Sequence, residues 1–166
     1  MQTRKRHVGK KVPLAIAVFS TETVEGECVA RPTAKGVSLT VHFSKLPKGP
    51  HGFHIHTAGD LRGEGCKGAC AHYQKGSPTT HGGPPTEKDR PRHTGDLGNI
   101  TLPAKGMFQE TYFLRGVHVH DLWGRSLIVH ADSDDLGLGG HDDSKTTGHS
   151  GARIACAVIG RGTETC

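Results

Sequence analysis

Short strand-length runs broken by turn-forming residues are the feature that most limits how this chain can fold. Of its 166 residues, 24 are glycine and 9 are proline, and no stretch combines a 3.6-residue apolar period with helix caps. β-Branched or alternating runs occupy residues 14–20, 24–32, 37–43, 99–102, 107–114, 126–130 and 153–160. Together with the alternating segment 53–56, these runs predict an antiparallel sandwich or barrel of about eight strands.

Two long segments, 57–94 and 131–152, do not fit this strand pattern. The first is rich in glycine, proline, histidine and charge, and the second in glycine, aspartate, serine and threonine. Loops of this length inside a compact domain are usually functional or disordered. Each begins just after a strand that ends in a histidine, His56 in the first case and His130 in the second. We therefore expect the scaffold to hold a functional site there.

Histidine is the most unusual component of the composition, with 13 residues, and a metal site is the first explanation to test. In HGFHIHTAGD, His54 and His56 alternate with Phe53 and Ile55, so in a strand both imidazoles face the same side. Such a pair is either half of a metal site or a solvated strand edge. Partners elsewhere in the chain have to decide between the two.

Four more candidate ligands follow along the chain: His72, His81, His93 and Asp96. In RHTGDLGN, His93 and Asp96 are three residues apart across a glycine, a spacing that a tight turn can close around one ion. Three imidazole nitrogens and one carboxylate oxygen suit tetrahedral zinc, whereas an imidazole-only set from the strand ends suits copper. The spacing neither assigns the ligands to two ions nor shows that the ions are neighbours.

The net charge of +5 comes from the start of the chain, where Arg4, Lys5, Arg6, Lys10 and Lys11 precede the first acidic residue. Residues 1–11 are therefore predicted to form a basic, disordered tail, with binding to RNA, DNA or another anionic surface as the alternative. A nucleic-acid-binding barrel is disfavoured because aromatic residues, which could stack on bases, make up only 5% of the chain.

Hydropathy and cysteine content indicate the compartment. No apolar run approaches the ~20 residues of a membrane span, and the run 12–19 is not followed by a small-residue cleavage pattern. We therefore expect no signal peptide and a cytoplasmic location. The five cysteines cannot all pair within the chain, which favours a reducing compartment over a disulfide scaffold; they are Cys28, Cys66, Cys70, Cys156 and Cys166.

Six motifs in a fixed order make the chain similar to a known family. The motifs are GFHIHTAGD, GCKGAC, HGGP, RHTGDLGN, GRSLIVHADSDDLGLGG and GARIACAVIG. Together they resemble the copper/zinc superoxide dismutase family over nearly the whole chain, from about residue 12 to 160. The resemblance implies an all-β fold, an eight-stranded antiparallel Greek-key β-barrel or sandwich with two long functional loops, as one domain over residues 12–166. It also implies an enzyme that disproportionates superoxide to dioxygen and hydrogen peroxide by alternate reduction and reoxidation of copper, with zinc as structural and electrostatic support.

The resemblance also assigns roles to particular residues. It implies four copper ligands, His54, His56, His72 and His130. It implies four zinc ligands, His72, His81, His93 and Asp96, so that His72 bridges the two metals and acts in catalysis. Asp134 would hold one histidine from each metal and so fix the orientation of both rings.

Further residues follow from the same resemblance. Arg153 would lie at the mouth of the copper site and attract the anionic substrate, with Thr147 and Lys145 along the channel. Cys66 and Cys156 match the family's disulfide, which would restrict the unfolded chain by ~4–5 kcal/mol.

The segment around His72 departs from the family pattern. It reads CAHYQK over residues 70–75, whereas the family has Gly-Pro before this histidine and Phe-Asn-Pro after it. Loss of both prolines is expected to loosen this part of the loop while the ligand stays in place. Cys70 is expected to be a small buried residue, with a soft metal ligand as the alternative.

The expected partners are the superoxide substrate, a second copy of the chain and a copper chaperone. Arg161 and Trp123 stand where the family's dimer has apolar contacts. The arginine puts the usual interface in doubt, while the tryptophan is a good anchor. A noncatalytic zinc-binding or copper-handling relative is the alternative function, disfavoured because every ligand position is filled.

Three other histidines receive structural roles. A second HxH, His118 and His120 in GVHVHDLWG, is expected to be a solvated strand. His51, just before the copper strand, is expected to pack and form hydrogen bonds.

Overall fold

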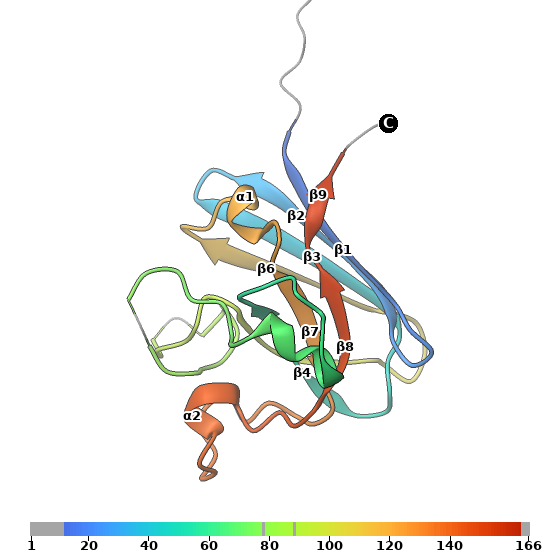
Figure 1. Cartoon of the computed structure of the whole chain (residues 1–166), viewed down its shortest axis with the longest axis vertical. Helices are drawn as coiled ribbons and strands as arrows, with labels where there is room; N and C mark the ends of the chain where they lie inside the picture. Colours follow the sequence, from blue (N-terminus) through green and yellow to red (C-terminus); the bar gives the residue numbers. More distant parts are fainter. Residues whose placement is uncertain (1–11, 78, 88, 164–166) are drawn as a thin grey trace, which may run out of the picture.

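The structure is a computed structural model that describes residues 12–77, 79–87 and 89–163. The predicted basic tail, residues 1–11, lies outside the described residues. Within the described chain, nine strands form two antiparallel sheets that share one hydrophobic core (Figure 1). No helix in this part of the chain has the length and apolar character needed to cross a membrane.

Each sheet combines strands from distant parts of the chain. The five-stranded sheet has the order β6-β3-β2-β1-β9 and contains β1 (Leu14–Ser20), β2 (Glu25–Thr33), β3 (Gly36–Lys45), β6 (Phe108–Arg115) and β9 (Gly160–Gly162). The four-stranded sheet has the order β5-β4-β7-β8 and contains β4 (Pro50–His56), β5 (Asp96–Thr101), β7 (Ser126–His130) and β8 (Arg153–Val158). Three short helices lie in the connections: η1 (Glu64–Ala69), α1 (Val119–Leu122) and α2 (Ser144–Thr147).

The predicted all-β antiparallel class is confirmed, but the described strands form two sheets and do not close into one barrel. The last predicted strand, 153–160, divides into β8 and β9 in different sheets. The division falls at Ile159, which is buried and whose N–H donates to the carbonyl of Arg125 at 2.8 Å, while its own carbonyl accepts from Gly124 at 2.9 Å. These bonds end the β8 ladder and direct the chain toward β1.

The alternation of residues along a strand explains which side chains of most strands face the core. Along β3 every second residue is buried, and Phe43 packs with Phe19 and Phe53 at ring-centroid distances of 5.4 and 5.5 Å. Strand β4 differs because residues on both of its faces are buried. Phe53 and Ile55 belong to the core, so His54 and His56 occupy the opposite face, which the long loops cover.

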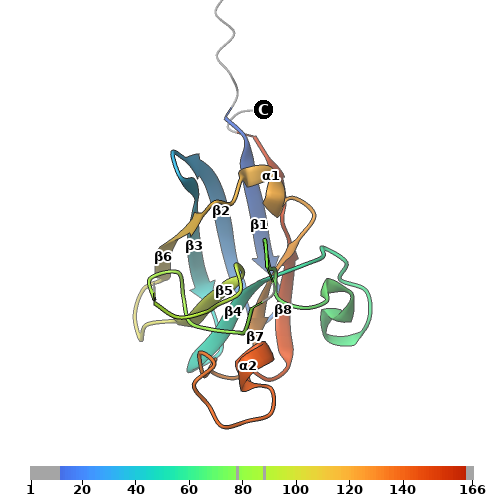
Figure 2. The same cartoon turned by 90° about the vertical axis from the view of Figure 1, so that its left-hand side faces the viewer.

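The second long loop lies at the opposite end of the molecule from the ends of the described chain. Helix α2, in the loop after β7, lies at one end, while α1 and both ends of the described chain lie at the other (Figures 1 and 2).

Candidate metal centre

Four histidines from separate parts of the chain meet beside β4. His54 and His56 lie on β4, His130 ends the neighbouring strand β7, and His72 pairs with His56 through an isolated β-bridge. All four are buried, and one potential ligand nitrogen of each lies within 4.8 Å of the others. The structure therefore brings together the four residues predicted to bind copper.

Each of these histidines has one nitrogen left without a partner. His56 Nδ1 lies 2.8 Å from the carbonyl oxygen of Cys70, and His130 Nδ1 lies 3.2 Å from that of Gly151. The remaining nitrogens are buried and have no hydrogen-bond partner among the described residues: His54 Nδ1, His56 Nε2, His72 Nε2 and His130 Nε2. An unsatisfied buried polar atom costs about 1–3 kcal/mol, and a shared metal ion would remove that cost. The residues therefore fit a metal, and an imidazole-only set suits copper.

A second group of ligands surrounds the fully buried carboxylate of Asp96. Its Oδ1 lies 2.8 Å from His72 Nδ1, 3.0 Å from His81 Nδ1 and 3.3 Å from His93 Nδ1. These four residues also offer ligand atoms within 4.8 Å of one another, a set that suits tetrahedral zinc. Because His72 faces this group with Nδ1 and leaves Nε2 free, one imidazole connects the two groups.

A tight turn closes the second group. The N–H of His93 donates to Asp96 Oδ2 at 2.7 Å, and the N–H of Asp96 donates to the His93 carbonyl at 3.2 Å. A Cβ atom at Gly95 would overlap the carbonyl oxygen of Ile55. The turn can therefore pack against β4 only with glycine at this position, as in the RHTGDLGN motif.

Asp134 links the two groups of ligands. Its Oδ2 lies 2.8 Å from His54 Nε2, and its Oδ1 lies 2.8 Å from His81 Nε2. A carboxylate in this position fixes the tautomer and orientation of both rings. The structure thus places Asp134 between one histidine of each group.

Two supporting residues were not predicted from the sequence. Asn99 accepts from the backbone N–H of Asp134 at 2.7 Å and donates to its carbonyl at 2.8 Å, which fixes the start of the loop. A side chain at Gly148 would overlap Asp134 Oδ1 and His81 Nε2. Asn99 is part of RHTGDLGN, so its motif could have identified it, whereas Gly148 has no distinguishing local signal.

Burial and carboxylate contacts set the protonation of the site. Burial lowers the pKa of His56 to about 2 and that of His130 to about 4, so both imidazoles are in the neutral form that binds metal. Burial also disfavours protonation of His81, but its contacts with Asp134 and Asp96 outweigh burial and raise its pKa to about 9. Burial opposes ionisation of Asp134, yet hydrogen bonds from two histidines lower its pKa to about 2.

Arg153 lies beside the four-histidine group. It is the β-ladder partner of His130, and its guanidinium donates to the carbonyls of Cys66 at 2.8 Å and Cys70 at 2.7 Å. The predicted disulfide joins Cys66 to Cys156 across 90 positions. Because Cys66 is covalently tied to β8, one of the two carbonyls that hold Arg153 is fixed to the strand from which this side chain comes.

The two predicted channel residues lie on α2. Thr147 Oγ1 contacts Asp143 Oδ2 at 3.0 Å, and the Lys145 ammonium donates to the Gly137 carbonyl. The carbonyl of Lys145 also accepts from the N–H of His81 at 2.8 Å. Both side chains therefore make these contacts within the second long loop, whose backbone bonds directly to the second ligand group.

Other predictions for single residues gave mixed results. Cys70 is exposed, so the prediction that it is buried is wrong; its positive φ of 61° belongs to the bend after η1, where the chain leaves the core. His51 is buried, and its Nδ1 lies 2.9 Å from the carbonyl of His130, so the predicted packing role is confirmed. His118 and His120 are exposed, but they lie at and within the start of α1 and not in a strand.

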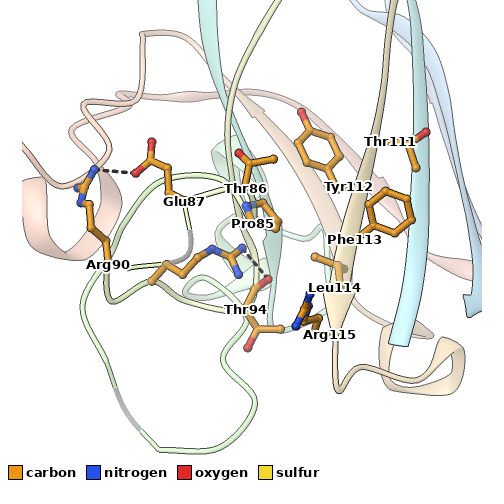
Figure 3. Close-up of a pocket in the computed structure, with 11 residues that line it drawn as sticks. Pro85, Thr86, Glu87, Arg90, Thr94, Thr111, Tyr112, Phe113, Leu114 and Arg115 are labelled. Atoms are coloured by element: carbon orange, nitrogen blue, oxygen red, sulfur yellow. Dashed lines mark hydrogen bonds and ion pairs between the residues drawn. The ribbon is translucent and has the colours of Figure 1, made fainter. Parts of the chain in front are cut away.

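A separate hollow lies beside the segment that carries His93. This cavity of about 600 Å³ is lined by residues 85–87, 90, 92 and 94 and by β6, and three arginines are in its lining, Arg90, Arg92 and Arg115 (Figure 3). Arg90 pairs with Glu87 at 2.7 Å, and Arg92 donates to the Gly83 carbonyl at 3.0 Å. None of the histidines lines the hollow, so it is distinct from the candidate metal centre.

The chain is similar to several known proteins. Residues 24–159 match the family model described as copper/zinc superoxide dismutase (SODC). The chain is 46% identical over 134 residues to "Superoxide dismutase [Cu-Zn]" of Paramecium bursaria Chlorella virus 1, covering 77% of this chain and 68% of the viral protein. It is 44% identical over 129 residues to "Extracellular superoxide dismutase [Cu-Zn]" of Drosophila melanogaster, covering 76% and 68%. A solved structure of "the clock protein EA4" has a TM-score of 0.78 at 34% identity, covering 94% of this chain and 99% of that one.

Proposed function

Because the chain belongs to the copper/zinc superoxide dismutase family, we propose which of its residues hold the metals and carry the reaction. The protein is an enzyme that disproportionates superoxide to dioxygen and hydrogen peroxide, with copper and zinc as cofactors. Copper is held by four histidines: His54, His56, His72 and His130. The supporting observation is that one buried nitrogen of each lacks a hydrogen-bond partner among the described residues and lies near the other three.

Zinc is held by His72, His81, His93 and Asp96. The geometry around Asp96 supports this assignment, since three imidazole nitrogens lie within 3.3 Å of its carboxylate. Asp134 keeps His54 and His81 in one orientation, so that each ring presents its other nitrogen to a metal.

When both metals are bound, copper supplies one-electron redox chemistry and zinc supplies a fixed positive charge. His72 is the catalytic residue that handles a proton. Its Nδ1 faces the zinc group while Nε2 faces the copper group, so Nε2 can accept a proton and return it without the ring leaving its place. Two superoxide ions and two protons give one dioxygen and one hydrogen peroxide, so each turnover needs such a proton path.

Arg153 attracts and orients the substrate. Its guanidinium is held beside His130 by two loop carbonyls, and a fixed positive charge beside the site raises the local concentration of a small anion. Lys145 and Thr147 complete the wall of the approach from α2.

The test combines metal analysis with activity. We expect the wild-type protein to hold one copper and one zinc per chain and to consume superoxide much faster than the same amount of free copper. His130→Ala should lose copper and activity but keep zinc, whereas the control His42→Ala should keep both metals and full activity. If His130→Ala retains copper and the wild-type rate, the ligand assignment fails.

We also propose that the chain forms a homodimer through the surface around Trp123 and Arg161. The Trp123 indole donates to the Leu14 carbonyl at 2.9 Å, and the Arg161 guanidinium lies 5.3 Å from its ring. A partner at this face would therefore bury the arginine together with the indole. Light scattering should show a dimer for the wild type and a monomer for Trp123→Glu; a wild-type monomer would refute the proposal.

A cytoplasmic location and loading by a copper chaperone complete the proposal. An exposed free thiol at Cys70 favours a reducing compartment, although one relative is named as an extracellular enzyme. Cell fractionation tests the location. Copper content after expression with and without a copper chaperone tests the loading route.

A further inference from the structure

The hollow beside β6, which we call the β6 groove, is not used by the proposed reaction. Five consecutive residues of the strand, 111–115, line one side of it, and the loop residues 85–87, 90, 92 and 94 line the other (Figure 3). Successive side chains of a strand point to opposite faces of its sheet. A wall made of five consecutive residues therefore follows the edge of the strand, where its main chain is accessible.

The outer main-chain groups of β6 have no partner among the described residues. The neighbour of β6 in its sheet is β3, and within the described chain no backbone hydrogen bond joins residues 108–115 to either long loop. On the side away from β3, the N–H and C=O groups of alternate residues therefore face the groove. An unpaired edge of this kind is a template for a further strand.

Several devices that usually block an edge strand are absent from β6. Its eight residues, FQETYFLR, include no lysine and no proline, and its pairing with β3 runs from Phe108 to Arg115 without a register shift. Natural proteins use lysine, proline and β-bulges to prevent an edge from pairing. In addition, Phe113 is 62% exposed, so a large apolar side chain is available to pack on a neighbouring strand.

The walls of the groove are positively charged. Three arginines, Arg90, Arg92 and Arg115, line it together with a single carboxylate, Glu87. An adjoining hollow, which shares the end of β6, adds Lys35 and no acidic residue. Glu87 is paired with Arg90 at 2.7 Å, whereas Arg115 makes no side-chain hydrogen bond or ion pair with another described residue. The uncompensated cation thus lies at the end of the unpaired edge.

We propose that the β6 groove binds an extended acidic segment of a partner protein, which joins the five-stranded sheet as a strand beside β6. Main-chain hydrogen bonds to β6 supply the affinity, and acidic side chains near Arg115 and Lys35 supply the preference for sequence. Residues 111–115 span about 13 Å when extended, so a segment of similar length fills the groove. A second copy of this chain is a poorer occupant, because it would bring an equally basic groove against this one.

The experiment uses the metal-loaded enzyme and the capped peptide Thr-Glu-Val-Glu-Val-Glu-Thr. Calorimetry should show one peptide bound per chain. Hydrogen exchange followed by mass spectrometry should show slower exchange in residues 108–115 but not in β9, at the opposite edge of the same sheet. Two altered peptides should each bind at least about tenfold more weakly: one with lysine in place of every glutamate, which reverses its charge, and one with methylated central amide nitrogens, which cannot donate to β6.

A pair of charge variants tests the place of binding. Arg115→Glu should weaken binding of the acidic peptide by about tenfold or more, because it places a like charge beside the peptide. Lys105→Glu makes the same change of charge at an exposed residue outside both hollows, so it should bind the peptide as the wild type does. Elemental analysis should find both metals in each variant, which reports that the variants are folded.

The proposal is overturned if the acidic peptide does not bind at about 1 mM, if the methylated peptide binds equally well, or if exchange in residues 108–115 is unchanged. Displacement of the peptide by inorganic phosphate would show a site for a small anion only. A dimer of the chain that the peptide dissociates would make a second copy the occupant. Both of these outcomes also contradict the proposal, and none of them affects the assignment of the two metals.

Discussion

The ammonium nitrogen of Lys75 lies 2.6 Å from a carboxylate oxygen of Asp121, which ties the segment after His72 to the start of α1. The same ammonium donates to the Gly116 carbonyl at 2.9 Å. Nearby, Tyr73 is buried under the guanidinium of Arg125, 3.6 Å from its ring centroid. Tertiary contacts thus hold the segment in which the family's prolines are missing.

Lys75→Met should weaken this attachment modestly. The pair is partly exposed, and exposed ion pairs contribute about 0.2–1 kcal/mol, so we expect a small loss of unfolding free energy and faster release of zinc to a chelator. Denaturant unfolding and chelator kinetics measure the two effects, with Lys48→Met as the control at an exposed lysine. Equal zinc release from both variants would show that the Lys75 contact does not hold His72.

Replacing Lys75 with proline should not make the segment after His72 more stable. The N–H of Lys75 donates to Thr94 Oγ1 at 3.0 Å, and proline has no N–H to give. The expected stabilisation from a stiffer unfolded chain is therefore offset by a lost hydrogen bond.

Asp134→Asn should loosen both metals at once. The amide provides one acceptor and one donor, whereas both histidine contacts of Asp134 need an acceptor, so one of the two hydrogen bonds is lost. Mutation of a residue that forms a hydrogen bond to a metal ligand lowers metal affinity by about 10–100-fold. Competition with a chelator, followed by elemental analysis, measures the change for each metal. The neighbouring exposed variant Asp132→Asn should behave like the wild type; a similar loss there would argue against a specific role for Asp134.

Arg153→Glu should lower the second-order rate constant by about tenfold or more, because the charge that attracts superoxide is reversed. The rate should also become less sensitive to ionic strength, since salt screens the attraction that the substitution removes. Stopped-flow measurements across a salt series test both effects. Arg153→Lys keeps the charge but cannot reproduce both carbonyl contacts, so its loss should be smaller; an unchanged rate in the glutamate variant removes Arg153 from substrate capture.

Removal of the disulfide should affect stability and activity together. Cys156→Ser opens a covalent loop that spans 90 positions, for which the chain-entropy model gives about 4–5 kcal/mol of stability. It also frees Cys66, whose carbonyl holds Arg153, so the rate constant should fall. Denaturant unfolding of the metal-loaded variant measures the first effect. Cys28→Ser, which changes a buried unpaired cysteine, should leave the rate unchanged.

The metal-free protein should lose stability in acid. Burial lowers the pKa of His130 to about 4 and that of His56 to about 2, while an unfolded histidine has a pKa of about 6.5. Below pH 6.5 the unfolded chain therefore binds more protons than the folded chain, and stability falls with pH. His81 acts in the opposite direction, since its raised pKa of about 9 gives stability that is present below pH 6.5 and lost as pH rises through 9.

Thermal melting of the metal-free protein between pH 7 and pH 4 tests this balance. We expect the melting temperature to fall over this range, and the fall should be smaller in His130→Gln, which removes one of the two histidines. A constant melting temperature would mean that these imidazoles are not held neutral by the fold.

The local sequence pattern was sufficient to predict the strands and the types of side chain that could bind metal. The alternation in HGFHIH placed His54 and His56 on one face of β4, because successive residues of a strand point to opposite sides. The same pattern could not predict the short helix after His118, since its four residues are too few to show a helical period. Nor did local sequence show that Cys70 is exposed, because burial at a bend depends on what packs against it.

The sequence by itself determined which donors are available: imidazoles and carboxylates on strand ends and in two long loops. Only the tertiary structure decided how they combine, because the contacts join residues far apart in the chain. Asp134 meets His54 across 80 positions and His81 across 53, and Asn99 holds Asp134 from another strand. Loops without periodicity acquire their conformation from such contacts, so the orientation of His72, with Nδ1 toward one ligand group and Nε2 toward the other, is a property of the folded chain.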